Sequence, residues 1–337
     1  MKTLKLTWLT ALLGALLLPL AQAEEVVVYT ARNEQLIKPL FDAYTKETGV
    51  QVKFATDKEG PLMARLKAEG RNTPADLFMT VDAGNLWQAA QEDLLKPVNS
   101  KVLAANIPAH LRDPANKWFG LSVRARTLVY NRNKVKPGEL ATYEDLASPK
   151  WKGHLCLRTS KKVYNQSLVG MMMSEHGEEK TEQIVRGWVA NLATAPFPDD
   201  TLAMEAVAAG LCDVTVVNTY YFGRLIAKKP DLPLAIFWPN QKLSNAAAGV
   251  HVNISGAGLT RYAKHEAAAI KLLEWLSSET AQNLYADVDL EYPANPKVKA
   301  DATVAAWGTF KPNLINVAQA GALQAKAVML MDRAGFK

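Results

Sequence analysis

The sequence lacks the short motifs that mark most nucleotide-dependent and hydrolytic enzymes. It contains no GxSxG, no Walker loop and no GxGxxG, and its histidines show neither HxxxH nor HExxH spacing. The acidic pair Asp199 and Asp200 is interpreted as the start of a helix at Thr201 rather than as a carboxylate pair for hydrolysis. We therefore expect a protein without enzymatic activity.

The sequence also lacks a block of lysine and arginine, and it has no aromatic ladder set in such a block. Its formal net charge of +6 at pH 7 is spread along the chain. A spread-out positive charge keeps a protein soluble and suits anionic cargo, but it gives no support to nucleic-acid binding. We expect no nucleic-acid partner. An internal repeat and a low-complexity linker are absent as well.

Cysteine is scarce, with Cys156 and Cys212 as the two examples. There is no CxxC and no histidine at ligand spacing, which disfavours a thiolate metal site. In an oxidising compartment the two thiols would pair, and a disulfide is the preferred interpretation. Two separate buried thiols are the alternative. A bridge would fix the spacing of the segments that follow, which contain Tyr164 and Tyr220.

The N-terminus has the pattern of an export signal. Lys2 and Lys5 form a basic region, residues 6–18 an apolar core, and Ala21-Gln22-Ala23 an A-x-A cleavage site. We expect residues 1–23 to be a signal peptide, cleaved after Ala23, and the mature chain to be soluble in the periplasm. An uncleaved membrane tether is the alternative.

Short apolar strands alternate with amphipathic helices, a pattern typical of α/β proteins with mainly parallel sheets. A long strand over 118–131 carries Arg124 and Arg126, and a return strand over 250–255 would cross back. We expect two doubly wound lobes joined by crossing hinge strands, with a cleft between the lobes. The expected boundaries are residues 24–124 plus 250–300 for the N-lobe and 125–249 plus 301–337 for the C-lobe.

Tyr220 and Tyr221 follow the apolar strand over 214–217, where the chain can turn into a helix, and Tyr164 is in a similar setting. A phenol has a pKa of ~10, so only a strongly polarising cation would hold several phenolates at neutral pH. Fe(III) fits best, because three phenolates cancel its three charges. Ordinary packing is the alternative interpretation of such a pair.

Seven segments, in their order and spacing, resemble the periplasmic ferric iron-binding proteins, which are type II solute-binding receptors of ABC iron importers. The segments are VVVYTARNE at Val26, TPADLFMTVDAG at Thr73, WFGLSVRARTLVYN at Trp118, LRTSKKVYNQS at Leu157, VNTYYFGRL at Val217, SGAGLT at Ser255 and EYPANP at Glu291. The resemblance covers nearly all of residues 25–337. It implies the type II periplasmic-binding-protein fold, no enzymatic activity and an ABC iron-importer permease as the membrane partner. We expect a monomer.

The resemblance implies Fe(III) ligands at Tyr164, Tyr220 and Tyr221. Other family members use a histidine after the first strand and a glutamate after the third. This chain has Asn33 and Val81 at those positions, which argues against the His-Glu type of site. Glu34 is a candidate for a fourth ligand, although a residue that merely lines the cleft is the preferred interpretation. Asn33 is a further candidate for the metal or the cleft.

In this family a carbonate, bicarbonate or phosphate completes the iron shell, so the resemblance also predicts a synergistic anion. The candidate anion-binding residues are Ser160, Lys161, Arg124, Arg126, Asn218 and Arg32. Ser160 and the following backbone amides precede a helix and would form an anion nest. Either Arg124 or Arg126 would add a bidentate contact, with a structural salt bridge as the alternative.

The alternative function is a solute-binding protein with an organic or anionic cargo, such as a polyamine, thiamine or a phosphonate. These cargoes do not require three convergent phenols.

Overall fold

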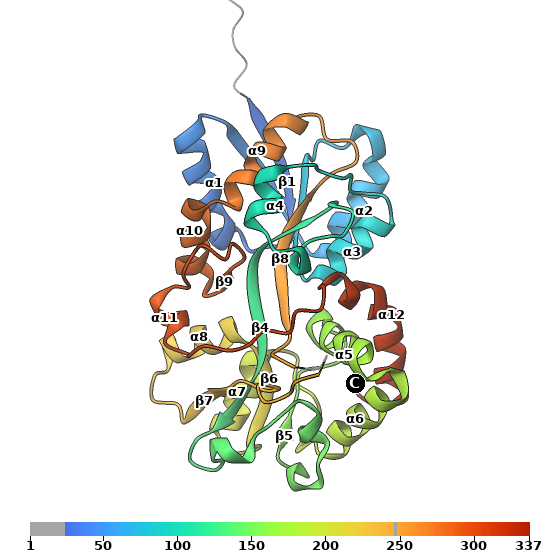
Figure 1. The fold of residues 1–337 in the computed structure, drawn as a ribbon, viewed down its shortest axis with the longest axis vertical. Helices are drawn as coiled ribbons and strands as arrows, with labels where there is room; N and C mark the ends of the chain where they lie inside the picture. Colours follow the sequence, from blue (N-terminus) through green and yellow to red (C-terminus); the bar gives the residue numbers. More distant parts are fainter. Residues whose placement is uncertain (1–23, 246–247) are drawn as a thin grey trace, which may run out of the picture.

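The computed structural model of the protein describes residues 24–245 and 248–337, apart from the side chains of residues 286–289. The signal peptide expected over residues 1–23 lies outside the described residues. Figure 1 shows two α/β lobes, with β4 and β8 running from one into the other. Within the described ranges, no helix is long and apolar enough to cross a membrane.

The strands are β1 (Glu25–Thr30), β2 (Gln51–Thr56), β3 (Leu77–Val81), β4 (Phe119–Asn131), β5 (Leu155–Cys156), β6 (Val214–Asn218), β7 (Leu234–Phe237), β8 (Val252–Leu259) and β9 (Tyr292–Pro293). Their order is β2-β1-β3-β8-β4-β6-β5, and β7 and β9 also pair with β4. Strand β1 is parallel to β2 and β3, whereas β8 is antiparallel to β3 and β4. The two predicted crossing strands therefore pair with each other. The α/β class is confirmed, but most strand pairs among the described residues are antiparallel, contrary to the expectation of mainly parallel sheets.

The α-helices are α1 (Glu34–Thr48), α2 (Glu59–Glu69), α3 (Ala83–Gln91), α4 (Lys101–Asn106), α5 (Val163–His176), α6 (Glu178–Ala190), α7 (Asp200–Ala208), α8 (Thr219–Lys228), α9 (Glu266–Leu276), α10 (Glu279–Asp289), α11 (Ala302–Ala305) and α12 (Ala318–Arg333). Short 3₁₀ helices are η1 (Gly70–Asn72), η2 (Ala109–Leu111), η3 (Pro137–Glu139), η4 (Glu144–Ala147) and η5 (Pro149–Trp151). Helix α7 starts at Asp200 with Asp199 as its N-cap, in agreement with the interpretation of that acidic pair.

Each lobe has a hydrophobic core of its own. In the N-terminal lobe, Leu40, Leu77 and Leu272 are buried in one cluster. In the C-terminal lobe, Leu155 and Trp188 are buried in another. Removing these side chains from water is the main force that holds each lobe together.

The C-terminal helix α12 contacts both lobes. It lies along α5, which belongs to the expected C-lobe, and it also packs on α3 of the other lobe (Figure 1). The close approach depends on Gly321, where an added Cβ would lie 2.4 Å from the side chain of Trp87. The tail over residues 301–337 is therefore in contact with more than the expected C-lobe.

Candidate functional site

The structure brings the three predicted tyrosines together. Tyr164 lies in the first turn of α5, and Tyr220 and Tyr221 lie in the first turn of α8. The hydroxyl of Tyr220 donates a hydrogen bond of 3.1 Å to the hydroxyl of Tyr164. The ring centroids of Tyr220 and Tyr221 are 4.5 Å apart. All three side chains line one cavity of about 180 Å³.

The change from strand to helix at Asn218 lets two adjacent tyrosines face one cavity. Side chains that alternate along a strand would point to opposite faces, whereas those in a helical turn do not. Asn218 occupies the N-cap position, but in the described chain its side chain makes no capping bond. Its Oδ1 instead accepts from Arg126 Nη1 at 3.1 Å, and its Nδ2 donates to the Tyr220 hydroxyl at 3.4 Å. Asn218 therefore positions Tyr220.

The predicted disulfide between Cys156 and Cys212 is present and links positions 56 residues apart. Both cysteines are buried. Cys156 ends β5, which is parallel to β6, and Cys212 lies just before β6. The bridge thus ties together the two segments that lead into the helices carrying the tyrosines.

Cationic side chains surround the phenols. The guanidinium carbons of Arg124 and Arg158 lie 5.2 and 5.3 Å from the centroid of the Tyr164 ring. Lys162 Nζ lies 5.1 Å from the same centroid. The guanidinium carbon of Arg224 lies 5.0 Å from the centroid of the Tyr220 ring. Positive charge at these distances favours a phenolate over a neutral phenol and also attracts an anion. These side chains therefore surround the tyrosines with positive charge.

Burial is the main effect on the phenols themselves. It raises the pKa values of Tyr164 and Tyr220, and negative charge on a neighbouring tyrosine raises each pKa further, while Arg124 acts in the opposite direction. At neutral pH both groups are therefore neutral until a strongly polarising cation enters. Such a cation would release their protons as it binds.

Arg124 and Arg126 both form buried ion pairs. Arg124 Nη2 lies 2.9 Å from Asp82 Oδ2, and Arg126 Nη1 lies 3.2 Å from Asp200 Oδ2. Arg126 also donates to Asn165 Oδ1. These contacts favour the structural interpretation of the two arginines. In the described residues neither lines the tyrosine cavity, and anion binding by either stays a prediction.

The loop before α5 uses the donors that were expected to form an anion nest. The Ser160 amide donates to the Lys337 carbonyl at 3.2 Å, and the Lys161 amide donates to Thr159 Oγ1 at 3.3 Å. The Lys162 amide donates to the Thr159 carbonyl at 3.4 Å. An anion at Ser160 or Lys161 would have to displace these bonds.

The N-terminal lobe supplies the opposite wall of the cavity. Arg32, Asn33 and Val81 line it, whereas Glu34 is exposed and, in the part of the chain that the structure describes, does not. Arg32 is buried, and its Nη1 lies 3.4 Å from Glu291 Oε2. Of the residues in this lobe that were predicted to bind the metal or the anion or to line the cleft, Arg32 and Asn33 thus line the cavity.

Sequence reasoning missed four charged residues at the site, Glu59, Arg158, Arg224 and Glu291. Three of them lie in segments that carry the family resemblance, so a signal was present. Burial opposes the charge of Glu291, but Arg32, Arg124 and a hydrogen bond from Ser122 outweigh burial and hold the pKa of Glu291 below its usual value.

No pattern in the sequence indicated that Glu59 would lie at the tyrosine cavity. Its carboxylate lies 3.7 Å from Lys162 Nζ, an ion pair between α2 of one lobe and the start of α5 in the other. Both side chains line the tyrosine cavity. The pair therefore spans the cavity between the lobes.

Residues 72–312 match the family of bacterial extracellular solute-binding proteins. The chain is 40% identical over 322 residues to iron uptake protein A1 of Synechocystis sp., covering 94% of this chain and 88% of that protein. A Trichodesmium protein solved with iron and citrate superposes with a TM-score of 0.89 and 42% identity, over 93% of this chain and all of that one. Ferric iron-binding protein A of Mannheimia haemolytica, solved in an open conformation, superposes with a TM-score of 0.87 and 36% identity, over 93% of this chain and 99% of that one.

These similarities confirm the type II periplasmic-binding-protein fold. They group the chain with transport proteins rather than with enzymes, as expected.

Proposed function

The chain belongs to the bacterial extracellular solute-binding proteins, and on this premise we propose that it is an extracytoplasmic receptor that captures Fe(III) in the tyrosine cavity. It delivers the ion to the permease of an ABC importer. Tyr164, Tyr220 and Tyr221 bind the ion as phenolates. The iron is cargo, and the protein performs no chemical step on a substrate.

One observation carries this proposal: phenols from two distant segments meet at a single buried point, with Tyr220 and Tyr164 oxygens 3.1 Å apart. A hard trivalent cation is the cargo that makes such a cluster of oxygen donors favourable. The names of the relatives supply independent support, because they are iron uptake and ferric iron-binding proteins.

An anion completes the iron shell in this proposal. Phenolates from the C-terminal lobe leave positions open toward the other lobe, where Arg32 lies. Lys162 and Arg224 lie in the same cavity and add positive charge. Because these three cationic side chains line the cavity itself, they are the candidates for holding carbonate, bicarbonate or phosphate.

Closure between the lobes buries the loaded ion. The Glu59 to Lys162 pair joins the two walls of the cavity in the conformation described. Opening would break this contact and expose the phenolates to water and protons, which weakens iron binding. The permease would then receive the ion from the opened receptor.

The test is a visible absorption titration of metal-stripped protein from residue 24 onward with chelated Fe(III), with and without bicarbonate. We expect a saturable one-to-one tyrosinate charge-transfer band that bicarbonate sharpens. The Tyr164→Phe and Tyr221→Phe variants should each weaken the band, whereas Tyr262→Phe, outside the cavity lining, should leave it unchanged. Absence of the band at any iron concentration would overturn the ferric proposal and favour an organic or anionic cargo.

A further inference from the structure

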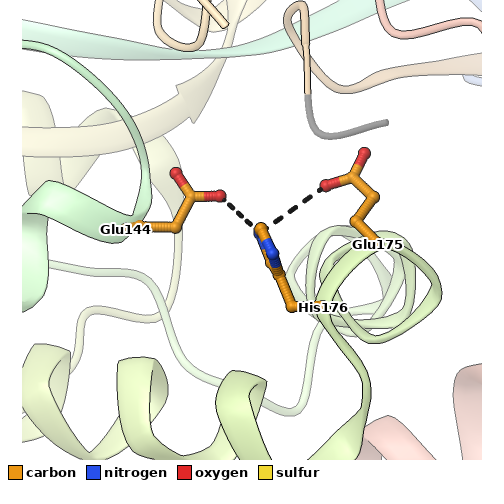
Figure 2. Close-up of side chains that lie close together, drawn as sticks. All are labelled: Glu144, Glu175 and His176. Carbon is orange, nitrogen blue, oxygen red and sulfur yellow. Dashed lines mark hydrogen bonds and ion pairs between the residues drawn. The ribbon is translucent and has the colours of Figure 1, made fainter. Parts of the chain in front are cut away.

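A second cluster of potential metal ligands lies at the other end of the helix that carries Tyr164. Glu144 is the first residue of η4, and Glu175 and His176 end α5. Figure 2 shows the three side chains directed toward one another. His176 Nε2 lies 2.7 Å from Glu144 Oε1 and 4.0 Å from Glu175 Oε2, and the three ligand atoms lie within 4.8 Å of one another.

The carboxylate of Glu175 is buried without full compensation. Its side chain is 0% exposed, and among the described residues its Oε2 has no hydrogen-bond partner. That oxygen is the one that faces His176 (Figure 2). Glu144 Oε2 is a second buried oxygen without a hydrogen-bond partner in the described chain. Buried polar atoms in this state are rare and costly, because they lose water without replacement.

The dipole of helix α5 raises the free-energy cost of burying the Glu175 carboxylate. The C-terminal end of α5 carries partial negative charge, which disfavours a carboxylate and favours a cation. A positive ion between the two carboxylates would remove both the mutual repulsion and the conflict with the helix dipole.

Two asparagines donate hydrogen bonds to the carboxylates of the cluster. Asn313 Nδ2 donates to Glu175 Oε1 at 2.5 Å, and Asn240 Nδ2 donates to Glu144 Oε1 at 3.4 Å. Outer hydrogen bonds of this kind orient metal ligands in known sites. Glu175 thus has its outer oxygen held by an amide and Oε2 available to an ion. On Glu144 the amide contacts Oε1, the oxygen nearest His176, and Oε2 has no hydrogen-bond partner in the described chain.

We propose that Glu144, Glu175 and His176 form a second metal site, which binds a divalent transition-metal ion such as Zn²⁺ and keeps one coordination position open to water. One imidazole and two carboxylates match the donor preferences of Zn²⁺ better than those of Ca²⁺ or Mg²⁺, which favour oxygen ligands. The two negative charges and a neutral imidazole balance the ion.

The geometry needs small adjustments. Ligand atoms about 2.0 to 2.1 Å from a tetrahedral Zn²⁺ lie roughly 3.3 Å from one another. The 4.0 Å separation between His176 and Glu175 must therefore shorten, and the 2.7 Å separation between His176 and Glu144 must lengthen. Each of these two changes is under about 1 Å, and the separation between the two glutamate ligand atoms, which is within 4.8 Å, must shorten by up to about 1.5 Å. Rotation of the glutamate side chains can supply these shifts.

This site is distinct from the iron cavity. Tyr164 and Glu175 lie at opposite ends of α5, roughly 16 Å apart along the helix axis at a rise of about 1.5 Å per residue. The donor types differ as well, since phenolates select a hard trivalent ion and this cluster selects a divalent one. Binding at the two sites can therefore be tested separately.

The test is isothermal titration of untagged, metal-stripped protein with Zn²⁺. We expect saturable binding of one ion, weakened about tenfold or more in Glu175→Gln and in His176→Gln, each with unchanged circular dichroism. His154→Gln is the matched control, because His154 also pairs with a carboxylate, that of Asp213, away from the cluster. This variant should bind Zn²⁺ as the wild type does.

Co²⁺ provides a spectroscopic readout of the same site. The wild-type protein should show a visible band of a low-coordinate Co²⁺ centre, and the Glu175→Gln variant should lose the band. Tyr164→Phe should retain both Zn²⁺ binding and the Co²⁺ band. Absence of saturable binding, retention of binding in both cluster variants, or loss of binding in Tyr164→Phe would each overturn the proposal.

Discussion

The hydroxyl oxygens of Tyr164 and Tyr220 lie 3.1 Å apart across a sequence separation of 56 residues. The disulfide between Cys156 and Cys212 spans the same separation. Each cysteine lies eight positions before its tyrosine, since 164 minus 156 equals 220 minus 212. The covalent bridge and the phenol contact are therefore two successive links between the same pair of segments.

Removal of the bridge should loosen the tyrosine site. For the Cys156→Ala, Cys212→Ala double variant we expect a loss of ~4 kcal/mol in the free energy of unfolding, because a long loop is no longer closed in the unfolded chain. Fe(III) binding should weaken as well. Urea unfolding and the tyrosinate band measure the two effects. An unchanged band in the folded variant would show that the bridge does not position the phenols.

Loss of the carboxylate at Asp200 should be strongly destabilising. Asp200 is fully buried, pairs with Arg126 and accepts from the Asn218 amide at 3.0 Å. The Asp200→Ala variant leaves a buried guanidinium without its partner, at a cost of about 3 to 5 kcal/mol in urea unfolding. Asp42→Ala removes an exposed pair with Lys38 and should change stability by less than about 1 kcal/mol. Equal effects in the two variants would contradict this interpretation.

Acid should destabilise the protein through His251. Burial, together with the charges of Arg124 and Arg126, lowers the pKa of His251 to about 3. The unfolded chain has a histidine pKa of about 6.5, so between these values the unfolded state binds more protons. The contribution of neutral His251 to the free energy of unfolding is therefore fully present above about pH 6.5, and it is lost as the pH falls toward 3.

Urea unfolding at several pH values measures this effect. At pH 5 the contribution of His251 should be smaller by ~2 kcal/mol than at pH 7.5. The His251→Leu variant should lack that part of the pH dependence. A variant whose stability follows the wild-type profile would rule out His251 as the source.

The contact between α12 and α3 should be intolerant of added volume. Gly321→Ala places a methyl group against Trp87, and we expect a loss of about 1 to 3 kcal/mol. Gly60→Ala in α2 meets open space and should stabilise the protein by about 0.5 to 1 kcal/mol. Shifts of the unfolding temperature in opposite directions for the two variants would support the tight packing of α12, whereas equal shifts would contradict it.

Local patterns were sufficient to predict much of the fold. The stripe containing Ile37, Leu40 and Phe41 is buried in α1, and the helix ends before Gly49, whose φ of 77° suits glycine. The helix starts at Glu34, before the first apolar residue, so its polar first turn carries no apolar periodicity that would mark the start. The two crossing strands were likewise visible as apolar runs.

The site was less accessible to sequence reasoning. The turn at Asn218 and the family resemblance indicated the tyrosines, but the partners of Arg124 and Arg126 depend on contacts between distant segments. Nothing in the local sequence around Asp82 indicates that its carboxylate pairs with Arg124 on another element. Glu59 reaches the cavity only because α2 and α5 come from different lobes and meet there.

Helix α12 has one further consequence. Because it packs on α3 at Trp87 and on α5 at Gly170, where an added Cβ would lie 3.4 Å from the Ala320 carbonyl, the lobes cannot rotate without sliding at one of these contacts. The packing of α12 against Trp87 would therefore change whenever the two lobes rotate relative to each other. Because the sequence has eight tryptophans, the difference in fluorescence between the wild type and a Trp87→Phe variant would report a change at this contact.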